Sequence, residues 1–375
     1  MTDGATSEAA LAANQRDQGR VVVLPGQTPA GGHILSVLLK RSYDIVRNGR
    51  ARRAESDRPL IPGDQSWGNP LNSTTRYESD FVPFKLGTDV VFDALAHAPG
   101  GVPAPNVLIG VRVAGRQRVL QVFGDRVARL SDRGAVVFTA PVPFETMEIR
   151  YEFAYGGTDV VSDKRIPYPY PRNPLGRGFA IARRTDVVDN LHLPNIEDAD
   201  NLLTPERLCI GEYAKWEGQP MPTGLGWFPK TSMPRAVFAG VMPADRALEQ
   251  ELRQAYARLV PAGQREAYVT NALPAMDFRF FNGASPGLSM PYLTGDERIE
   301  TVNLISEGRL AFFLPDDHPR IGLDIGDGME GLETVIQTVL VRMKEQQIDI
   351  TWRGALAYPG RDWLTCLRKM DIVVR

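Results

Sequence analysis

The sequence predicts a mainly β fold of packed antiparallel sheets, sandwich-like, with long irregular loops and one amphipathic helix. Glycine and proline are abundant, with 35 and 29 copies in 375 residues, and neither recurs at a short period, which is typical of a chain with many turns. Val107, Ile109, Val111 and Val113 alternate with other residues at the period of a half-buried strand.

The clearest β element is a hairpin over Asn106–Phe123. The alternating run is followed by a turn candidate, Ala114-Gly115-Arg116, and apolar residues return from Val119 onward. Other segments show strand-like composition or alternation: Val21–Leu24, Ile34–Val46, Ala135–Thr139, Met147–Tyr155, Leu310–Leu314, Thr334–Met343, Ile348–Trp352 and Asp371–Val374.

One segment has helical periodicity. Leu248, Leu252, Ala255 and Leu259 recur at spacings of four and three, and Pro243 suits a first turn. Residues 1–19 are polar and are expected to be disordered. Residues 20–375 are predicted to form a single large β-rich domain, or two β lobes divided near 160–235, where the chain is dense in proline, glycine and asparagine.

Composition argues against several classes of protein. With 43 basic and 45 acidic residues, the chain has no basic excess for binding nucleic acid. Its two cysteines, Cys209 and Cys366, make no disulfide framework. No apolar run reaches the length of a membrane span, and residues 1–19 lack the apolar core of a secretory signal. We therefore expect a cytoplasmic protein without nucleic-acid or membrane partners.

Motifs for chemistry are weak. Gly326–Gly331 matches G-x-G-x-x-G, but the following β-branched run from Thr334 predicts a strand where a dinucleotide site needs a helix. The four histidines are far apart, and no zinc-type spacing occurs. Glu197, Asp198 and Asp200 lack the glycine and closing glutamate of a calcium loop. We accordingly predict no catalytic residue, metal or cofactor, and no enzymatic activity.

Two alternatives remain open. Paired carboxylates could support glycoside hydrolysis; the candidates are Glu148, Glu152, Asp159, Asp296 and Glu297. A carbohydrate- or surface-binding β module would need exposed aromatic rings, for which Trp67, Trp227 and Trp363 are candidates.

A series of unusual strings runs in order along the chain: Tyr77–Lys85 (YESDFVPFK), Thr88–Val90, Val122–Arg126 (VFGDR), Pro143–Met147 (PFETM), Tyr151–Asp159 (YEFAYGGTD), Asn173–Gly178 (NPLGRG), Leu193–Asp198 (LPNIED), Phe280–Ala284 (FFNGA) and Gly295–Glu297. Over roughly residues 30–320 this series resembles domain-of-unknown-function family 2169. The resemblance implies an adaptor or chaperone of a bacterial type VI secretion system, because members are typically encoded beside spike proteins, PAAR-tip proteins and toxins. Its implied partners are an effector toxin, a PAAR-tip protein and the VgrG spike; it implies no catalytic residues.

Ten residues are candidates for partner binding or for a structural motif: Tyr155, Gly156, Gly157, Asn173, Gly176, Arg177, Glu197, Trp216, Trp227 and Phe228. The glycines suit a tight bend, and the planar guanidinium of Arg177 suits a carboxylate. That carboxylate belongs either to a partner or to this chain, with Glu152, Asp159 and Glu197 as internal candidates. The aromatic residues either present contact area to a partner or bury the irregular region against its own sheets.

Overall fold

The computed structural model describes residues 20–27, 33–82, 85–163, 165–182, 188–239, 277–324, 329–357 and 369–374. The predicted mainly β fold with several antiparallel sheets and few helices is confirmed. The predicted helix from Pro243 to Leu259 and the segment 1–19 lie outside the described residues. Within the described part, no helix is long and apolar enough to cross a membrane.

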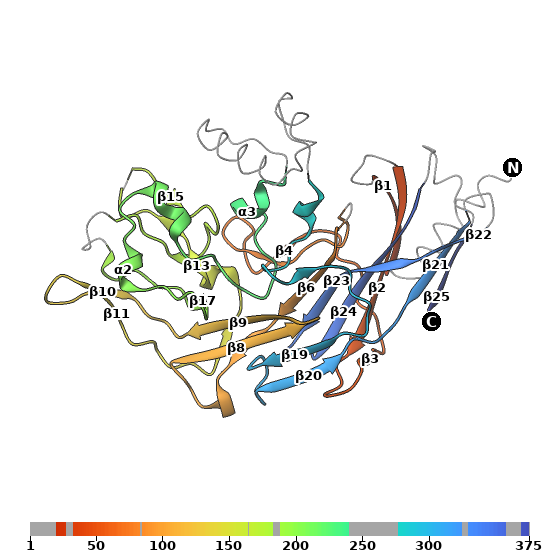
Figure 1. Cartoon of the computed structure of the whole chain (residues 1–375), viewed down its shortest axis with the longest axis horizontal. Coiled ribbons are helices and arrows are strands. Elements are labelled where there is room, and N and C mark those ends of the chain that lie inside the picture. Colours follow the sequence, from red (N-terminus) through yellow and green to blue (C-terminus); the bar gives the residue numbers. More distant parts are fainter. Residues whose placement is uncertain are drawn as a thin grey trace, which may run out of the picture.

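The largest sheet has the strand order β1-β2-β24-β23-β6-β18, with β3 also paired to β2 (Figure 1). Its strands are β1 (Val21–Gln27), β2 (His33–Asp44), β3 (Arg52–Arg53), β6 (Thr88–Asp93), β18 (Ser289–Met290), β23 (Thr334–Arg342) and β24 (Gln347–Ala357). All pairs are antiparallel except β23 with β6. The chain after Gly331 therefore continues as strand β23, as its β-branched run predicted.

The second sheet has five strands in the order β17-β9-β8-β19-β20. They are β8 (Asn106–Val113), β9 (Arg116–Phe123), β17 (Ile196–Asp198), β19 (Arg298–Val302) and β20 (Arg309–Phe313). The predicted hairpin is confirmed, with β8 and β9 in register from Asn106 opposite Phe123 to Val113 opposite Arg116. Ala114 and Gly115 form its turn, both with positive φ (46° and 77°).

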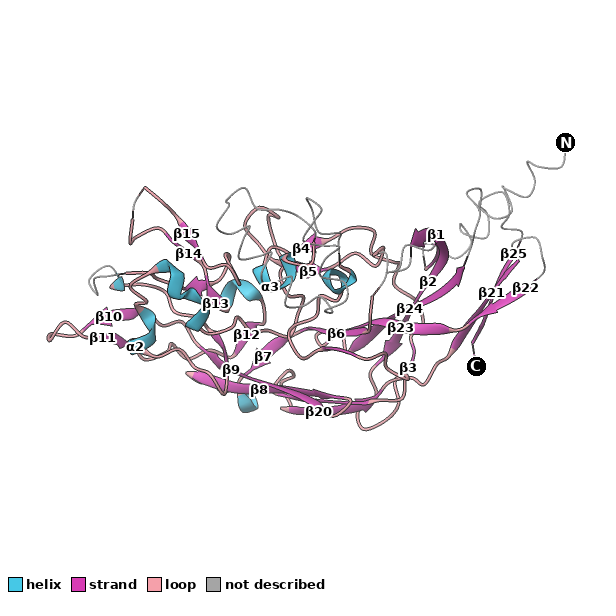
Figure 2. Ribbon diagram, turned by 45° about the horizontal axis from the view of Figure 1, so that its top comes forward, coloured by secondary structure: helices cyan, strands magenta, loops and turns pink. Residues whose placement is uncertain are grey.

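The two large sheets share one hydrophobic core. Val37 of β2 and Phe92 of β6 belong to the same buried cluster as Ile109 of β8 and Phe312 of β20. A three-stranded sheet adds Ile321 to this core; its strands are β22 (Met329–Leu332), β21 (Pro319–Asp324) and β25 (Lys369–Val374). In Figure 2 the five-stranded sheet forms the lower layer, beneath β6, β23 and β24.

A second, smaller buried cluster gathers residues between Ala128 and Trp216, with Tyr155 and Tyr170 at its centre. It corresponds to the green region at the left of Figure 1. Most elements there and in the connections are short: β4 (Gln65–Ser66), β5 (Thr75–Tyr77), β7 (Leu95–His97), β10 (Ala128–Leu130), β11 (Val136–Phe138), β12 (Thr146–Glu148), β13 (Tyr155–Gly156), β14 (Thr158–Asp159), β15 (Tyr168–Pro169), β16 (Arg177–Gly178), α2 (Pro205–Leu208) and α3 (Met233–Ala236). Short 3₁₀ turns span Pro99–Gly101, Tyr151–Phe153, Tyr213–Gly218 and Phe278–Phe281.

The predicted strand Met147–Tyr155 is wrong in most of its length. β12 ends at Glu148, and a 3₁₀ turn follows at Tyr151–Phe153. Tyr151 packs in the main core, whereas Tyr155 packs in the smaller cluster. A straight strand cannot place both side chains in these two separate cores, so the chain turns between them.

Candidate functional site

The strings Tyr151–Asp159 and Asn173–Gly178 meet in space. β13 and β16 pair in parallel, with Tyr155 opposite Arg177 and Gly156 opposite Gly178. The buried Asn173 side chain donates through Nδ2 to the carbonyl oxygens of Tyr151 (2.8 Å) and Tyr155 (3.1 Å). One asparagine therefore holds both ends of the turn between the two cores.

The glycines of this contact are required by close backbone approach. Gly156 has φ 146° and Gly157 has φ 103°, in the region that glycine adopts without strain. A Cβ at Gly156 would lie 2.1 Å from the carbonyl oxygen of Asn173, and one at Gly176 would lie 2.6 Å from that of Ala154. Any side chain here would force the two backbones apart.

Arg177 has partners within its own chain. Its Nη1 donates to Oδ1 of Asn195 (2.9 Å), and the guanidinium carbon lies 4.6 Å from the centre of the Phe153 ring. The carboxylate it pairs with is Asp125, at 3.8 Å, and not Glu152, Asp159 or Glu197 as the sequence suggested. Burial lowers the pKa of the Arg177 guanidinium, and Asp125 opposes that change. The arrangement favours a structural role for Arg177.

Glu197 is also engaged internally. Its carboxylate accepts hydrogen bonds from the Arg126 guanidinium and from the backbone N–H of Leu203. Burial raises the pKa of Glu197, while Arg126 and the Leu203 amide oppose the rise. The strings around Arg126, Arg177 and Glu197 thus form one half-buried polar assembly, which we call the Arg177 assembly.

The aromatic candidates lie inside the protein, so they do not form an exposed platform. Trp216, Trp227 and Phe228 are each no more than 5% exposed. Trp216 packs edge-on to Tyr170 in the smaller cluster, and Phe228 packs edge-on to Tyr151 in the main core. The irregular region has few strand-to-strand hydrogen bonds, so its large aromatic side chains hold it in place by packing into the two cores.

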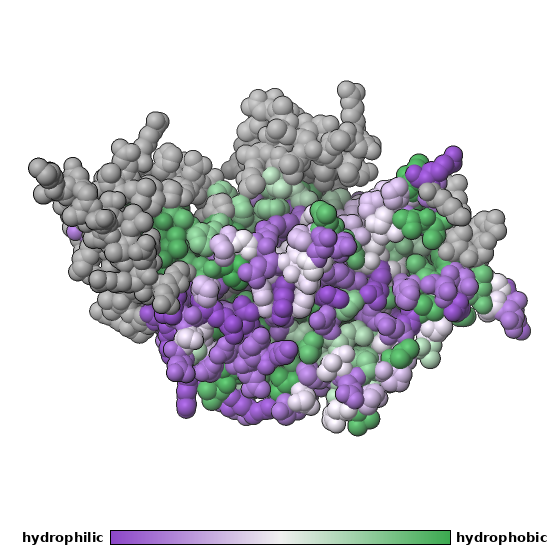
Figure 3. All heavy atoms as spheres, turned by 180° about the vertical axis from the view of Figure 1, so that it is seen from behind, coloured by the Kyte–Doolittle hydropathy of each residue, from purple (hydrophilic) through white to green (hydrophobic). Residues whose placement is uncertain are grey.

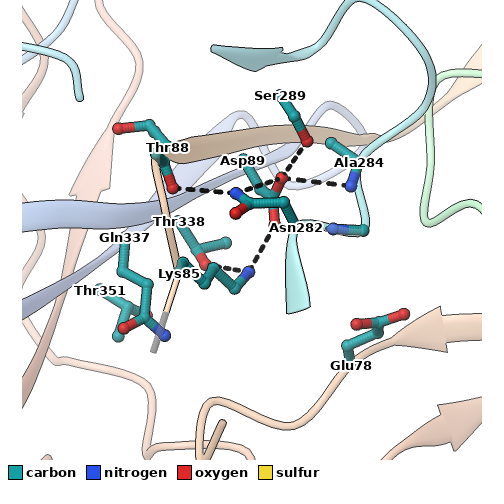
Figure 4. Close-up of polar contacts among 12 residues, drawn as sticks. Glu78, Lys85, Thr88, Asp89, Asn282, Ala284, Ser289, Gln337, Thr338 and Thr351 are labelled. Atoms are coloured by element: carbon teal, nitrogen blue, oxygen red, sulfur yellow. Dashed lines mark hydrogen bonds and ion pairs between the residues drawn. The ribbon is translucent and has the colours of Figure 1, made fainter. Parts of the chain in front are cut away.

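A second polar assembly, which the sequence reasoning did not single out, centres on the fully buried Asp89 of β6. Its carboxylate accepts from Lys85 Nζ (2.6 Å), the backbone N–H of Gly283 (3.0 Å) and that of Ala284 (3.3 Å). Ser289 and Asn282 donate to it as well. Figure 4 shows these groups turned toward Asp89. Lys85 Nζ also donates to Thr338 and lies 4.6 Å from the Trp227 ring centre.

Neighbouring charged side chains on the same face of the largest sheet are also paired. Lys40 of β2 pairs with Asp80, which also accepts from Thr351 of β24. Glu78 accepts hydrogen bonds from both terminal nitrogens of Arg235. All four side chains of these two ion pairs are at least 90% buried. In the sequence, the only local sign of this site is the charged residues within Tyr77–Lys85, just before the apolar residues of β6. We call this group the Asp89 assembly.

The family of the chain follows from the comparison of its sequence with protein-family models. A model described as an uncharacterized protein conserved in bacteria, DUF2169, matches residues 30–353. The chain belongs to the DUF2169 family. Searches of curated proteins and of solved structures found no significant match.

The DUF2169 match spans both polar assemblies, since Asp80 and Asp89 lie in one and Asn173, Arg177 and Glu197 in the other. In both, the charged and amide groups of the quoted strings bond mainly to one another and to backbone. Internal pairing of this kind fixes a scaffold, because a buried charge must be compensated where it lies.

Several residues named for the two carbohydrate alternatives have partners within the chain. Glu152 accepts from the backbone and hydroxyl of Thr74, and Asp159 caps a local turn at Val161 and Ser162. Trp67 is half-buried beneath Arg76, whose guanidinium carbon lies 4.5 Å from the ring centre. Trp363 lies outside the described residues. In the described part of this DUF2169 chain, no group of three or more His, Cys, Asp or Glu side chains could hold a metal ion.

The surface of the DUF2169 chain carries both hydrophilic and hydrophobic groups (Figure 3). On the face seen from behind, hydrophilic side chains gather over the middle of the molecule, with hydrophobic side chains beside them in smaller groups (Figure 3). On the outer face of the five-stranded sheet, a depression of about 340 Å³ is lined by Leu108, Gly110, Arg112, Val119, Val302 and Arg309, among others. This depression is open to solvent, unlike the buried Asp89 assembly.

Proposed function

We propose that this protein is a non-enzymatic adaptor that helps to load a toxic effector onto the VgrG or PAAR spike of a bacterial type VI secretion system. The observation that carries the proposal is the DUF2169 match over residues 30–353, together with the genetic neighbourhood that the family resemblance implies. On this proposal the protein acts in the cytoplasm, before secretion.

The internal chemistry supports a scaffold role. Asp89, Arg177 and Glu197 of the quoted strings are each bonded within the chain. Buried bonds of this type favour one arrangement of the residues that they join. A rigid β scaffold can hold a partner on its surface without chemistry of its own.

The test is co-expression with the toxin encoded beside its gene. An adaptor co-purifies with the toxin or the PAAR-tip protein at a fixed stoichiometry, and deleting its gene abolishes secretion of that toxin while the spike protein is still released. Complementation with the intact gene restores secretion.

If the neighbouring toxin is secreted normally without this protein and no complex forms with toxin, PAAR-tip or VgrG protein, the adaptor proposal is wrong. Hydrolysis of a polysaccharide that is lost in Glu152→Gln or Asp296→Asn would instead favour the hydrolase alternative.

A further inference from the structure

The outer face of the five-stranded sheet carries an apolar floor with a gap in its middle. Residues with odd numbers on β8, such as Ile109 and Val111, point into the core, so Leu108, Gly110 and Arg112 point outward. Gly110 lies opposite Val119 on β9 and Val302 on β19. The absent side chain at Gly110 leaves the depression between two valines, beside Leu108, which is 49% exposed.

Nothing in the backbone explains this glycine. Gly110 is not among the residues with positive φ, and a Cβ there would meet the carbonyl oxygen of Arg118 at 3.5 Å and Cγ2 of Val119 at 3.8 Å, ordinary contacts. Glycine inside a strand costs roughly 0.5–1 kcal/mol relative to alanine. A glycine in a central strand often marks a place where another chain approaches closely.

The rim of the depression is positively charged. Its lining includes two arginines, Arg112 and Arg309, and a single carboxylate, Glu300. Glu300 pairs with Arg298 at 2.5 Å and lies 3.8 Å from Arg112, which also donates to Gln117. The two lining guanidinium groups outnumber the one lining carboxylate, which Arg298 also neutralises, so the rim is net positive; the Arg112 and Arg298 side chains are more than half exposed.

We propose that this depression, the Gly110 groove, docks an apolar side chain of a partner protein segment whose flanking residues are acidic. The floor formed by Leu108, Val119 and Val302 takes the apolar group, and the rim arginines pair with its carboxylates. A second copy of the chain would bring the same arginines together. A nucleic-acid strand would need stacking surfaces, and the residues lining the groove include no aromatic side chain.

This inference refines the proposed function by naming the surface that would hold the toxin or PAAR-tip protein, but binding of an acidic segment can be measured without either. The probe is a short fluorescent peptide with central leucines flanked by aspartates. A matched peptide carries lysines in place of the aspartates. We expect the acidic peptide to bind at least about tenfold more tightly at low salt, with the difference shrinking as salt is added.

Three variants locate the binding. Gly110→Val fills the groove with a residue that strands favour and is expected to weaken binding about tenfold or more without lowering the melting temperature. Leu108→Asp, at an exposed position, places a carboxylate on the floor and should have the same effect. Arg112→Glu with Arg309→Glu should remove the preference for the acidic peptide.

The controls are matched in type and lie elsewhere. Gly63→Val is at an exposed glycine whose Cβ would meet nothing within 4 Å, and Arg133→Glu is on an exposed turn between β10 and β11. Both should bind the acidic peptide as the natural protein does. Equal binding of the two peptides, or unchanged binding by Gly110→Val and Leu108→Asp, would overturn the proposal.

The same variants separate this inference from the adaptor function. If the toxin co-purifies and Gly110→Val and Leu108→Asp both leave that complex intact, the adaptor function stands and the groove is not its docking surface. If the peptide binds in the groove and no toxin, PAAR-tip or VgrG protein does, the groove stands and the adaptor function fails.

Discussion

Replacing Asp89 by alanine tests whether the Asp89 assembly stabilises the fold. Asp89→Ala removes the carboxylate that neutralises Lys85, whose side chain is only 2% exposed. Lys85 would keep Thr338 and the face of Trp227 as its remaining contacts, and the backbone N–H groups of Gly283 and Ala284 would lose their acceptor.

The magnitude follows from these losses. Breaking a buried ion pair by removing one partner costs about 3–5 kcal/mol, because the other charge stays buried and uncompensated. Each backbone donor left without an acceptor adds up to about 1–3 kcal/mol, and the terms overlap because water can enter the space of the removed carboxylate. We expect Asp89→Ala to lower the free energy of unfolding by about 4–6 kcal/mol.

Urea unfolding followed by tryptophan fluorescence measures this change, and Trp227 lies beside Lys85 to report on it. Lys85→Met should lower the free energy of unfolding by less, because Asp89 keeps its other donors. The double variant Lys85→Met with Asp89→Ala should lower it by less than the two single changes summed. Glu212→Ala is the control, since its pair with Lys215 is more than 60% exposed on both sides and should be worth less than about 1 kcal/mol. A loss in Asp89→Ala no larger than that of the control would refute the reasoning.

Three further predictions concern other parts of the chain. Gly156→Ala should lower the melting temperature steeply or prevent folding, because its Cβ would lie 2.1 Å from the Asn173 carbonyl oxygen, whereas Gly63→Ala, which meets nothing within 4 Å, should be neutral in the same thermal scan. Burial and a hydrogen bond to the Asp93 carboxylate raise the pKa of Tyr77 from 10.0 to about 12, so the folded state holds this proton more tightly and stability falls as pH rises from 10 to 12. Tyr77→Phe should make that fall shallower in urea titrations, and an unchanged slope would contradict this prediction. Deleting residues 2–19 should leave the melting temperature nearly unchanged, and a drop of several degrees would show that this polar segment packs.

Much of the sheet structure could be predicted from local pattern. The hairpin of β8 and β9 has strict alternation and a glycine in its turn, and both properties are local. The strand after Gly331 followed from its β-branched residues. β6 was missed because its apolar residues are few and flanked by Asp89 and Asp93, whose burial depends on partners elsewhere in the chain.

The candidate site could be predicted only in part. Tyr155, Gly156, Gly157, Asn173, Gly176 and Arg177 were all candidates from the sequence, and the structure brings them together. The carboxylate beside Arg177 could not be predicted, because Asp125 follows β9 and meets Arg177 at Asn195, three segments that are far apart in the chain.

The sequence by itself determined the β class of this protein, its hairpin and the positions where glycine permits a sharp bend, because these depend on alternation and on backbone conformation within a few residues. Only the tertiary structure decided which groups became core and which became surface. Trp227 and Phe228 are buried because distant parts of the chain close over them. The buried Asp89 carboxylate is satisfied because the backbone N–H groups of Gly283 and Ala284 are brought to it across the chain. Gly110 became the floor of a groove because Val119 and Val302 pair on either side of it, and this register is set by the sheet as a whole.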